Sequence, residues 1–178
     1  MTGQRQIHNL ALVGFMGTGK SSVGRIVARQ LNFAFVDTDQ LIEARTHKSI
    51  STIFAKQGEA AFRESEGKIV TELESQRHLV IAAGGGLVVD ARNLASLRHH
   101  ALIVCLWASP ETIWQRVCNQ PHRPLLQDHD PLGKIQRLLA ERKSAYLQAD
   151  ILVNTEQRSA REVAQHVIHE FRQAKPGR

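Results

Sequence analysis

Short apolar runs alternate along the chain with longer segments in which apolar residues recur at helical spacing. Continuous apolar runs of this length are typical of strands that are buried on both faces of a parallel sheet. Strands that alternate with helices predict such a sheet, with helices packed on each face. We therefore expect an α/β fold whose five strands cover the apolar runs at 10–13, 33–36, 79–83, 101–107 and 151–153.

Helix signals fill the segments between these runs. Residues 23–31 place their apolar side chains on one helical face, and Ser109-Pro110 has the composition of a capped helix start. In the mostly helical stretch over 49–75, Ser51 is the expected cap. The other expected helices are a short one from about Leu41, and those over 90–97, 132–148 and the apolar positions 163–171.

The first apolar run leads into a glycine-rich stretch, Gly14-Phe15-Met16-Gly17-Thr18-Gly19-Lys20-Ser21, and a helix follows it. This order of strand, loop and helix matches the spacing G-x-x-x-x-G-K-[ST] of a phosphate-binding loop. Glycines let successive backbone N–H groups turn toward a phosphate, and the helix N-terminus adds a favourable dipole. Lys20 would reach the β- and γ-phosphates of a nucleotide, and Ser21 would ligate Mg²⁺.

Two carboxylates follow the second apolar run, and three glycines follow the third. Ligands of an open parallel sheet bind outside the carboxyl ends of its strands, so Asp37, Asp39 and residues 84–86 should lie beside the phosphate loop. One carboxylate could support Mg²⁺ while the other takes or orients a hydroxyl proton, or Thr38 or Asp39 could simply cap the next helix. Because no aspartate ends the third strand, Asp37 is the best candidate for the magnesium carboxylate. The glycines indicate close approach of the backbone to a ligand.

Composition narrows the class of protein. Of the 178 residues, 42% are hydrophobic and 22% are charged, as in a globular protein of one domain. The sequence shows neither a signal peptide after Met1 nor an apolar run long enough for a membrane span, and its two cysteines make no disulfide framework. We therefore expect a cytoplasmic protein that binds no membrane, with Cys105 as a buried apolar side chain.

The net charge of +6 raises the question of nucleic-acid binding. The basic residues are spread along the chain, however, and aromatic residues make up only 5%, whereas single-strand binding needs a basic face with stacking aromatics. Positive charge can instead serve anionic small molecules, so we expect no nucleic-acid partner. His166 and His169 have no cysteine or carboxylate cluster beside them in the sequence and predict a solvated helix face rather than a metal site.

Residues 119–131 differ from the rest, since three of the five prolines lie there and no apolar periodicity appears. A long polar loop near a nucleotide site suggests a mobile lid. Arg123 lies within it, Arg63 lies between the second and third strands, and Arg142 lies in the helix after it. A guanidinium group can bind carboxylate or phosphate oxygens with two parallel hydrogen bonds, although a single arginine is more often a solvated surface residue.

Taken together, these motifs resemble those of the shikimate kinases, P-loop enzymes of the nucleoside-monophosphate-kinase-like group. The resemblance extends from about Asn9 to Phe171, nearly the whole chain. The phosphate loop alone occurs in many unrelated enzymes, whereas the other motifs in their order are specific. These are Asp37-Thr38-Asp39, Phe62-Arg63 followed by Glu66, Gly84-Gly85-Gly86, Arg123-Pro124-Leu125-Leu126, and Arg142 with Tyr146.

The resemblance implies a single three-layer α/β/α kinase domain over residues 1–178, with a five-stranded parallel sheet in the order 2-3-1-4-5. It implies an acceptor-binding insertion over about 38–66 and a lid over about 119–131. The implied reaction transfers the γ-phosphoryl group of Mg–ATP to the 3-hydroxyl of shikimate, giving shikimate 3-phosphate and ADP, in aromatic amino-acid biosynthesis. We expect ATP and shikimate as the small-molecule partners, one Mg²⁺ per subunit, and a monomer.

The resemblance also implies a role for each candidate residue. Asp39 contacts the acceptor hydroxyl as the proposed base, and Arg123 contacts the transferring phosphate together with Lys20. Asp37 supports Mg²⁺ together with Ser21. The implied shikimate contacts are Asp39, Arg63, Gly84, Gly85, Gly86 and Arg142. The implied nucleotide contacts are Gly17, Thr18, Gly19, Lys20, Ser21, Ser22, Arg116, Arg123 and Arg158. Among these, Arg116 is implied to lie along adenine, while the loop around Arg158 matches the family pattern poorly.

Two other functions fit parts of the sequence. A gluconate kinase would share the phosphate loop and a carboxylate on its acceptor, but residues 37–39, Arg63 and residues 84–86 in combination argue against it. An ATP-dependent nucleic-acid-binding module is the alternative of a different class. For such a module, the logarithm of the binding constant for a random oligonucleotide would fall linearly with the logarithm of the salt concentration.

Overall fold

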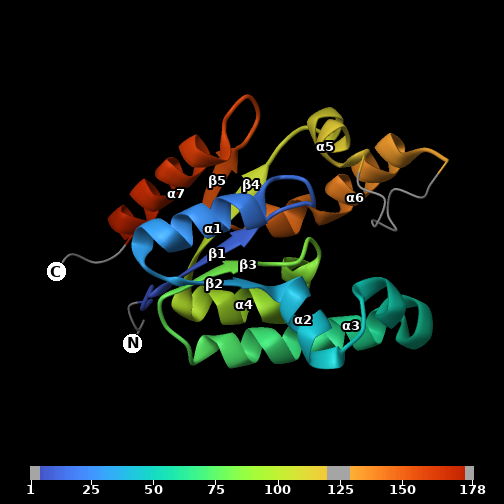
Figure 1. Ribbon diagram of the computed structural model, residues 1–178, viewed down its shortest axis with the longest axis horizontal. Helices are drawn as coiled ribbons and strands as arrows, with labels where there is room; N and C mark the ends of the chain where they lie inside the picture. The colour runs from blue at the N-terminus through green and yellow to red at the C-terminus, as the bar shows by residue number, and fades with distance from the viewer. Residues whose placement is uncertain (1–4, 120–128, 175–178) are drawn as a thin grey trace.

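The structure is a computed structural model that describes residues 5–119 and 129–174. Its five strands form one parallel sheet in the order β2-β3-β1-β4-β5, as the resemblance implied (Figure 1). The strands are β1 (Asn9–Val13), β2 (Ala34–Asp37), β3 (Leu79–Ala82), β4 (Ala101–Trp107) and β5 (Ile151–Asn154). Each begins and ends within one residue of the apolar run that predicted it.

Helices connect the strands and follow the last one. They are α1 (Lys20–Leu31), α2 (Thr38–Thr46), α3 (Ile50–Glu74), the 3₁₀ turn η1 (Leu87–Val89), α4 (Ala91–His100), α5 (Pro110–Val117), α6 (Pro131–Tyr146) and α7 (Ala160–Ala174). Ser109 caps α5 and Pro110 occupies its first turn, as predicted. Within residues 5–119 and 129–174, none of these helices is long and apolar enough to cross a membrane.

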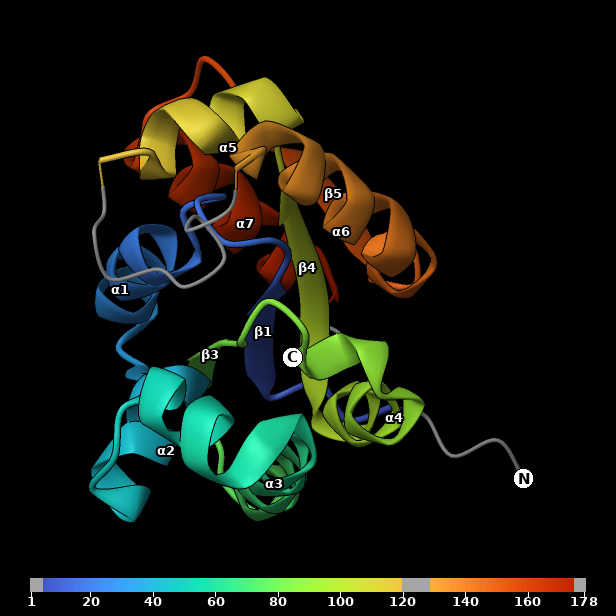
Figure 2. The same cartoon turned by 90° about the vertical axis from the view of Figure 1, so that its right-hand side faces the viewer.

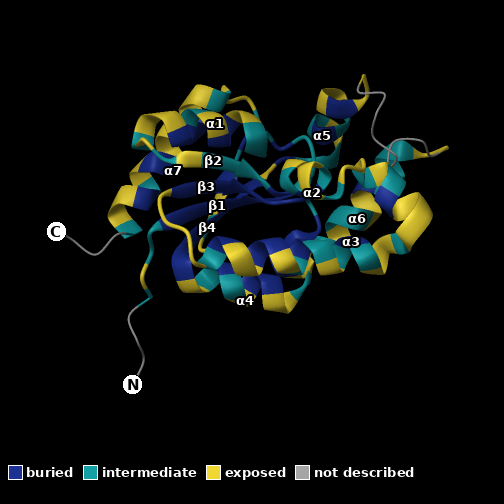
Figure 3. Ribbon diagram, turned by 60° about the horizontal axis from the view of Figure 1, so that its bottom comes forward, coloured by how far each residue is buried: buried dark blue, intermediate teal, exposed yellow. Residues whose placement is uncertain are grey.

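Helices cover both faces of the sheet, because successive residues of a strand point to opposite sides. Leu10 and Leu12 of β1 pack into a core with α1 and α7, whereas Ala11 and Val13 pack into a second core with α2 to α6. Figure 1 shows α1 and α7 on one side of the sheet and α3 and α4 on the other, and Figure 3 shows the buried strands between these layers. The predicted three-layer α/β/α architecture is confirmed.

The helix α3 starts and bends at positions that the apolar pattern did not indicate. Ser49, and not Ser51 as predicted, is its cap, since the Ser49 Oγ accepts a hydrogen bond from the Thr52 N–H at 3.2 Å. Gly58 has φ 81° and ψ 172°, so the helix is interrupted there. A positive φ favours glycine, which has no Cβ to clash with the backbone. The second half of α3 therefore runs in its own direction and carries Arg63.

The carboxyl ends of the strands bring three predicted segments to one edge of the sheet. The glycine-rich loop follows β1, Asp37 ends β2, and residues 84–86 follow β3 shortly after its end. Figure 2 looks onto this edge, with α5 and α6 on one side of it and α2 and α3 on the other. We refer to it as the carboxyl edge, and to the opposite one as the amino edge.

Candidate active site

The glycine-rich loop between β1 and α1 has backbone conformations that favour glycine. Its glycines have positive φ angles, 129° at Gly14, 75° at Gly17 and 95° at Gly19. A Cβ on Gly14 would lie only 2.2 Å from the Leu106 carbonyl oxygen, so the loop packs directly against β4. The sequence spacing thus reflects a requirement of both conformation and packing.

Lys20, the first residue of α1, lies across this loop. Its Nζ donates hydrogen bonds to the carbonyl oxygens of Gly14 and Phe15, each at 2.8 Å. The buried Thr18 Oγ1 donates to the same Phe15 oxygen at 2.8 Å, which fixes the turn. The ammonium group and the positive end of the α1 dipole therefore lie close together, an arrangement that suits a polyphosphate.

Ser21 and Asp37 meet where α1 begins and β2 ends. The Ser21 Oγ donates to the Asp37 Oδ2 at 2.8 Å. The Asp37 Oδ1 accepts from two backbone N–H groups in the first turn of α2, at 3.2 and 3.4 Å. Asp37 is thus the cap of α2, and the predicted alternative that Thr38 or Asp39 caps it is wrong. This cap also starts α2 earlier than predicted, and it orients the Asp37 carboxylate beside Ser21.

Gly84 is the point where the end of β3 meets α2. Its N–H donates to the buried Thr38 Oγ1 at 2.8 Å. A Cβ at this position would lie 2.5 Å from the Asp39 Oδ1 and 3.1 Å from the Glu66 Oε1. Two carboxylates therefore approach the glycine backbone closely, and a larger residue would displace them. The structure places Asp39 at the carboxyl edge, where the strand end predicted it.

Arg63 is held by two glutamates on its own helix. Its Nη1 donates to the Glu66 Oε2 at 2.7 Å, and its Nε and Nη2 donate to the Glu59 Oε1 at 3.2 and 2.9 Å. A Cβ on Gly86 would lie 2.6 Å from the Arg63 Nη1, so the guanidinium group packs against glycine backbone. Because the side chain is still 29% exposed, the guanidinium group is oriented without being sealed from a ligand.

Glu66 is fully buried, and it is a site residue to which the motif containing Arg63 gave no role. Burial raises the pKa of its carboxyl group, the hydrogen bond from Arg63 opposes that change, and Asp39 raises the pKa further. A buried carboxylate needs such a partner, since leaving it unpaired is costly. Glu66 lies in the apolar stripe that includes Phe62 and Ile69, and a charged residue in such a stripe is the signal that could have identified it.

Arg142 and Tyr146 of α6 bind one carbonyl oxygen, that of Gly85. The Arg142 Nη1 donates at 3.1 Å and the Tyr146 hydroxyl donates at 2.5 Å. Burial raises the pKa of Tyr146 to about 12, so its hydroxyl keeps the donated proton at neutral pH. The Arg142 guanidinium carbon also lies 5.5 Å from the centre of the Phe15 ring. Arg142 thus bridges the phosphate loop and the glycines after β3.

Arg116 of α5 joins the phosphate loop to the loop after β5. Its Nη1 donates to the Gly17 carbonyl oxygen at 3.3 Å and to the Thr155 Oγ1 at 2.9 Å, and its Nη2 donates to the Thr155 carbonyl oxygen at 2.8 Å. Ser22 is exposed in the first turn of α1, and Arg158 is exposed on the loop after β5. Thr155 is a further contact that the motifs did not indicate.

The remaining predictions concern the lid, Cys105 and the two histidines of α7. Arg123 and the lid residues 120–128 are outside the described residues. Cys105 is buried, as predicted. His166 and His169 are exposed on α7, as predicted for a solvated face. Within residues 5–119 and 129–174, no group of three or more histidine, cysteine, aspartate or glutamate side chains could hold a metal ion.

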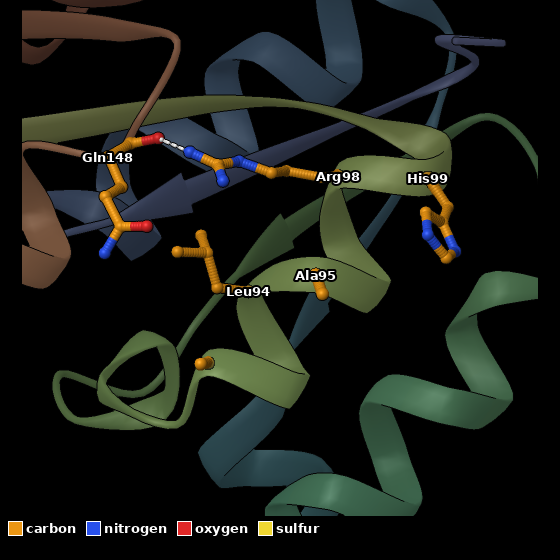
Figure 4. Close-up of a pocket in the computed structure, with 6 residues that line it drawn as sticks. Leu94, Ala95, Arg98, His99 and Gln148 are labelled. Atoms are coloured by element: carbon orange, nitrogen blue, oxygen red, sulfur yellow. Dashed lines mark hydrogen bonds between the residues drawn. The ribbon is translucent and has the colours of Figure 1, made fainter. Parts of the chain in front are cut away.

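A hollow of about 390 Å³ lies apart from these residues, between α4 and the chain just beyond α6 (Figure 4). The Arg98 Nη2 donates to the Gln148 carbonyl oxygen at 2.5 Å at its side. Its lining residues are Ala91, Leu94, Ala95, Arg98, His99 and Gln148. None of these is a predicted site residue, so the candidate active site is the polar carboxyl edge and not this hollow.

A phosphate loop that lies beside a carboxylate and two arginines defines a P-loop kinase for a small anionic acceptor. A sequence model of the shikimate kinase family matches residues 16–172. A shikimate kinase from Thermodesulfovibrio yellowstonii is 41% identical over 170 residues, which is 96% of this chain and 98% of the relative. The solved structure "Shikimate kinase from Acinetobacter baumannii in complex with shikimate" has a TM-score of 0.91 and 37% identity, with 97% of each chain covered.

The chain belongs to the shikimate kinase family. Its activity is the ATP-dependent phosphorylation of shikimate. A gluconokinase from Sinorhizobium meliloti matches with a TM-score of 0.65 and only 17% identity, over 95% of this chain and 94% of that one. That likeness shows only that the two proteins share a fold. It does not support the gluconate kinase alternative.

Proposed function

We propose that the carboxyl edge transfers the γ-phosphoryl group of Mg–ATP to the 3-hydroxyl of shikimate. One observation carries the proposal. Each of the three consecutive glycines at 84–86 has a charged side chain as its nearest neighbour, and these are Asp39, Arg142 and Arg63 in that order. A Cβ on the middle glycine would also lie 3.7 Å from the Gly14 carbonyl oxygen, so the cluster lies beside the phosphate loop.

In this proposal the charged cluster binds the acceptor. Arg63 and Arg142 donate parallel hydrogen bonds to the shikimate carboxylate, which neutral donors would hold less strongly. Asp39 accepts a hydrogen bond from the 3-hydroxyl, orients it and takes its proton as the new phosphorus–oxygen bond forms. The bond from phosphorus to the bridging oxygen of ADP breaks, and ADP leaves with that electron pair. The acceptor-binding insertion over about 38–66 supplies two of these three side chains.

The glycine-rich loop and Lys20 hold the β- and γ-phosphates, and Arg116 lies along adenine. The remaining nucleotide contacts in the proposal are Gly17, Thr18, Gly19, Ser22 and Arg158. Arg123, in the lid over about 119–131, contacts the transferring phosphoryl group. A closed lid would exclude water, which otherwise competes with the acceptor hydroxyl for that group.

Ser21 and Asp37 would hold one Mg²⁺ ion. Their Oγ and Oδ2 atoms lie 2.8 Å apart, and both are oxygen donors of the kind that this ion prefers. Magnesium sites in kinases use few protein ligands, because phosphate oxygens and water complete the shell. When bound, the ion neutralises charge on the phosphates. We further propose that the enzyme is a monomer.

A coupled assay of ADP release tests the proposal, with shikimate, shikimate lacking the 3-hydroxyl, and gluconate as acceptors. Of the three acceptors, we expect only shikimate to support ADP release. The phosphorus NMR spectrum of the product should place the phosphate on the 3-oxygen. A product phosphorylated on another hydroxyl would show that Asp39 faces a different oxygen. Rapid turnover of gluconate would contradict the assigned acceptor site.

A further inference from the structure

The first turn of α5 is tied to the loop after β5 by one carboxylate. The Glu156 Oε1 accepts hydrogen bonds from the Ser109 N–H at 2.8 Å and from the Thr112 Oγ1 at 3.0 Å. Ser109 is the cap of α5, and its Oγ accepts from the Thr112 N–H at 3.3 Å. The carboxylate therefore binds both the capping residue Ser109 and Thr112, whose N–H closes the first turn of the helix.

The last turn of α5 is tied to the same loop by Arg116. Its guanidinium group donates to both the side chain and the backbone of Thr155, as described above. Thr155 and Glu156 are consecutive, so one short segment fastens α5 near both of its ends. Figure 2 shows this segment, the loop after β5, close to α5. The orientation of α5, and with it the position of Arg116 beside Gly17, thus depends on this segment.

The hydrogen bonds around Glu156 keep its carboxyl group ionised. Hydrogen bonds from Ser109, followed by the one from Thr112, lower its pKa to about 2. The group is therefore an anion throughout the neutral range, and an anionic acceptor makes the stronger hydrogen bond. The Asn154 Oδ1 accepts from the Glu156 N–H at 2.7 Å, which fixes the turn on which the carboxylate stands.

We propose that Glu156 is a positioning residue for the nucleotide, which holds α5 so that the Arg116 guanidinium group stays between the phosphate loop and the loop after β5. The inference rests on the proposed function, in which Arg116 lies along adenine. Glu156 itself need not touch ATP. It acts through the helix, so its removal should weaken nucleotide binding while the acceptor site, formed by α2, α3 and α6, is unchanged.

Steady-state kinetics of Glu156→Ala test this inference. We expect the KM for ATP to rise on the order of 5-fold, as for the loss of about one hydrogen bond. The KM for shikimate and kcat at saturating ATP should stay at their original values, which a general loss of stability would not produce. Glu156→Gln keeps an oxygen acceptor and should recover part of the loss. Glu162→Ala is the matched control, because the Glu162 carboxylate of α7 accepts hydrogen bonds from the Ser159 N–H and Oγ at the end of the same connection.

Arg116→Ala, measured in parallel, separates this inference from the function on which it rests. If Arg116→Ala leaves the KM for ATP unchanged, the assignment of Arg116 to the nucleotide is wrong. If Arg116→Ala raises that KM while Glu156→Ala behaves like Glu162→Ala, the positioning role of Glu156 is overturned and the proposed function stands. Equal increases in the KM values of both substrates for Glu156→Ala would also overturn it.

Discussion

The two edges of the sheet use buried polar residues in opposite ways. At the amino edge, the Asn9 Nδ2 donates to the Gln76 carbonyl oxygen at 2.7 Å and lies 2.8 Å from the His100 Nδ1. The Asn9 Oδ1 accepts from the Leu79 N–H at 2.9 Å. Asn9 thereby joins the start of β1 to the residues before β3 and β4. Its amide group is satisfied by the protein itself, as buried polar groups generally are.

At the carboxyl edge, carboxylate and guanidinium side chains lie against glycine backbone. Arg63 and Arg142 are partly exposed, and Asp39 lies against Gly84. Oriented charges of this kind suit an anionic ligand, because their hydrogen-bonding geometry is set before the ligand arrives. The same sheet thus carries a network for stability at one edge and a binding site at the other. Variants at the carboxyl edge should therefore change catalysis, and variants at the amino edge should change stability.

The largest effect is expected for Lys20→Ala. The lysine neutralises phosphate charge and belongs to a loop and not to a hydrophobic core, so turnover should be abolished while the fold persists. Stopped or continuous assays of ADP release, together with thermal unfolding, measure the two properties. Near-normal turnover in the variant would mean that the glycine-rich loop does not hold the transferred phosphate.

Asp39→Asn keeps the shape of the side chain and removes its charge. If the carboxylate takes the hydroxyl proton, kcat should fall by roughly 10²–10⁴-fold. A loose transition state depends more on positioning than on deprotonation, so a loss at the low end would indicate that Asp39 mainly orients the hydroxyl. An unchanged kcat would remove Asp39 from the reaction altogether.

Arg63→Lys and Glu66→Gln change the two partners of the ion pair in the acceptor site. A point charge cannot reproduce the two-pronged donor, so Arg63→Lys should raise the KM for shikimate on the order of 10-fold to 100-fold and leave that for ATP nearly unchanged. Glu66→Gln should act in the same direction but less, because it weakens only the support of Arg63. Glu64→Gln, on the exposed face of the same helix, is the control and should have no effect. Equal changes in both KM values would place Arg63 outside the acceptor site.

The smallest effect on turnover, and a clear one on stability, is expected at the amino edge. His100 is 2% exposed, and burial lowers its pKa from 6.5 to about 4, with His8, Glu74, His99 and Arg5 as charged neighbours. The unfolded chain therefore binds a proton more readily than the folded one between these values. Protonation of His100 in the unfolded chain should therefore lower the free energy of unfolding as the pH drops from above 6.5 toward 4. The expected loss from this group is roughly 3 kcal/mol.

Urea unfolding across this pH range checks the expectation. His100→Gln should flatten the dependence on pH, whereas His169→Gln, at an exposed position on α7, should leave it as it is. If the unchanged protein and His100→Gln lose stability equally with falling pH, the histidine is not the responsible group.

The sequence predicted the strands closely, because a strand buried on both faces leaves a continuous apolar run that needs no knowledge of its neighbours. It predicted the phosphate loop for a similar reason, since the positive φ angles of that loop favour glycine at fixed positions. The start of α3 was harder to place, because Ser49 and Ser51 are both good caps and only the contact with Thr52 decides between them. The interruption at Gly58 was missed, because a single glycine in a helical segment does not by itself mark a break.

Within the site, the residues in recognisable motifs were placed at the carboxyl edge as predicted, apart from Arg123, which lies outside the described residues. The supporting roles of three residues were not predicted. Glu66 entered only as a member of a motif, and Thr155 and Glu156 only as part of the loop around Arg158. Their contacts with Arg63, Arg116 and Ser109 become visible only in the structure. The roles of the motif residues in catalysis stay predictions until the variants above are measured.

Arg63 and Arg142 are proposed to bind the acceptor carboxylate, and removing the charge of that group tests this role. Shikimate and its methyl ester should be compared as acceptors, with the unchanged enzyme and with Arg63→Lys. We expect kcat/KM for the ester to be far lower than for shikimate in the unchanged enzyme, and Arg63→Lys to narrow that difference. If the ester is phosphorylated as efficiently as shikimate, the arginines of the carboxyl edge do not bind the carboxylate, and the proposed acceptor site is wrong.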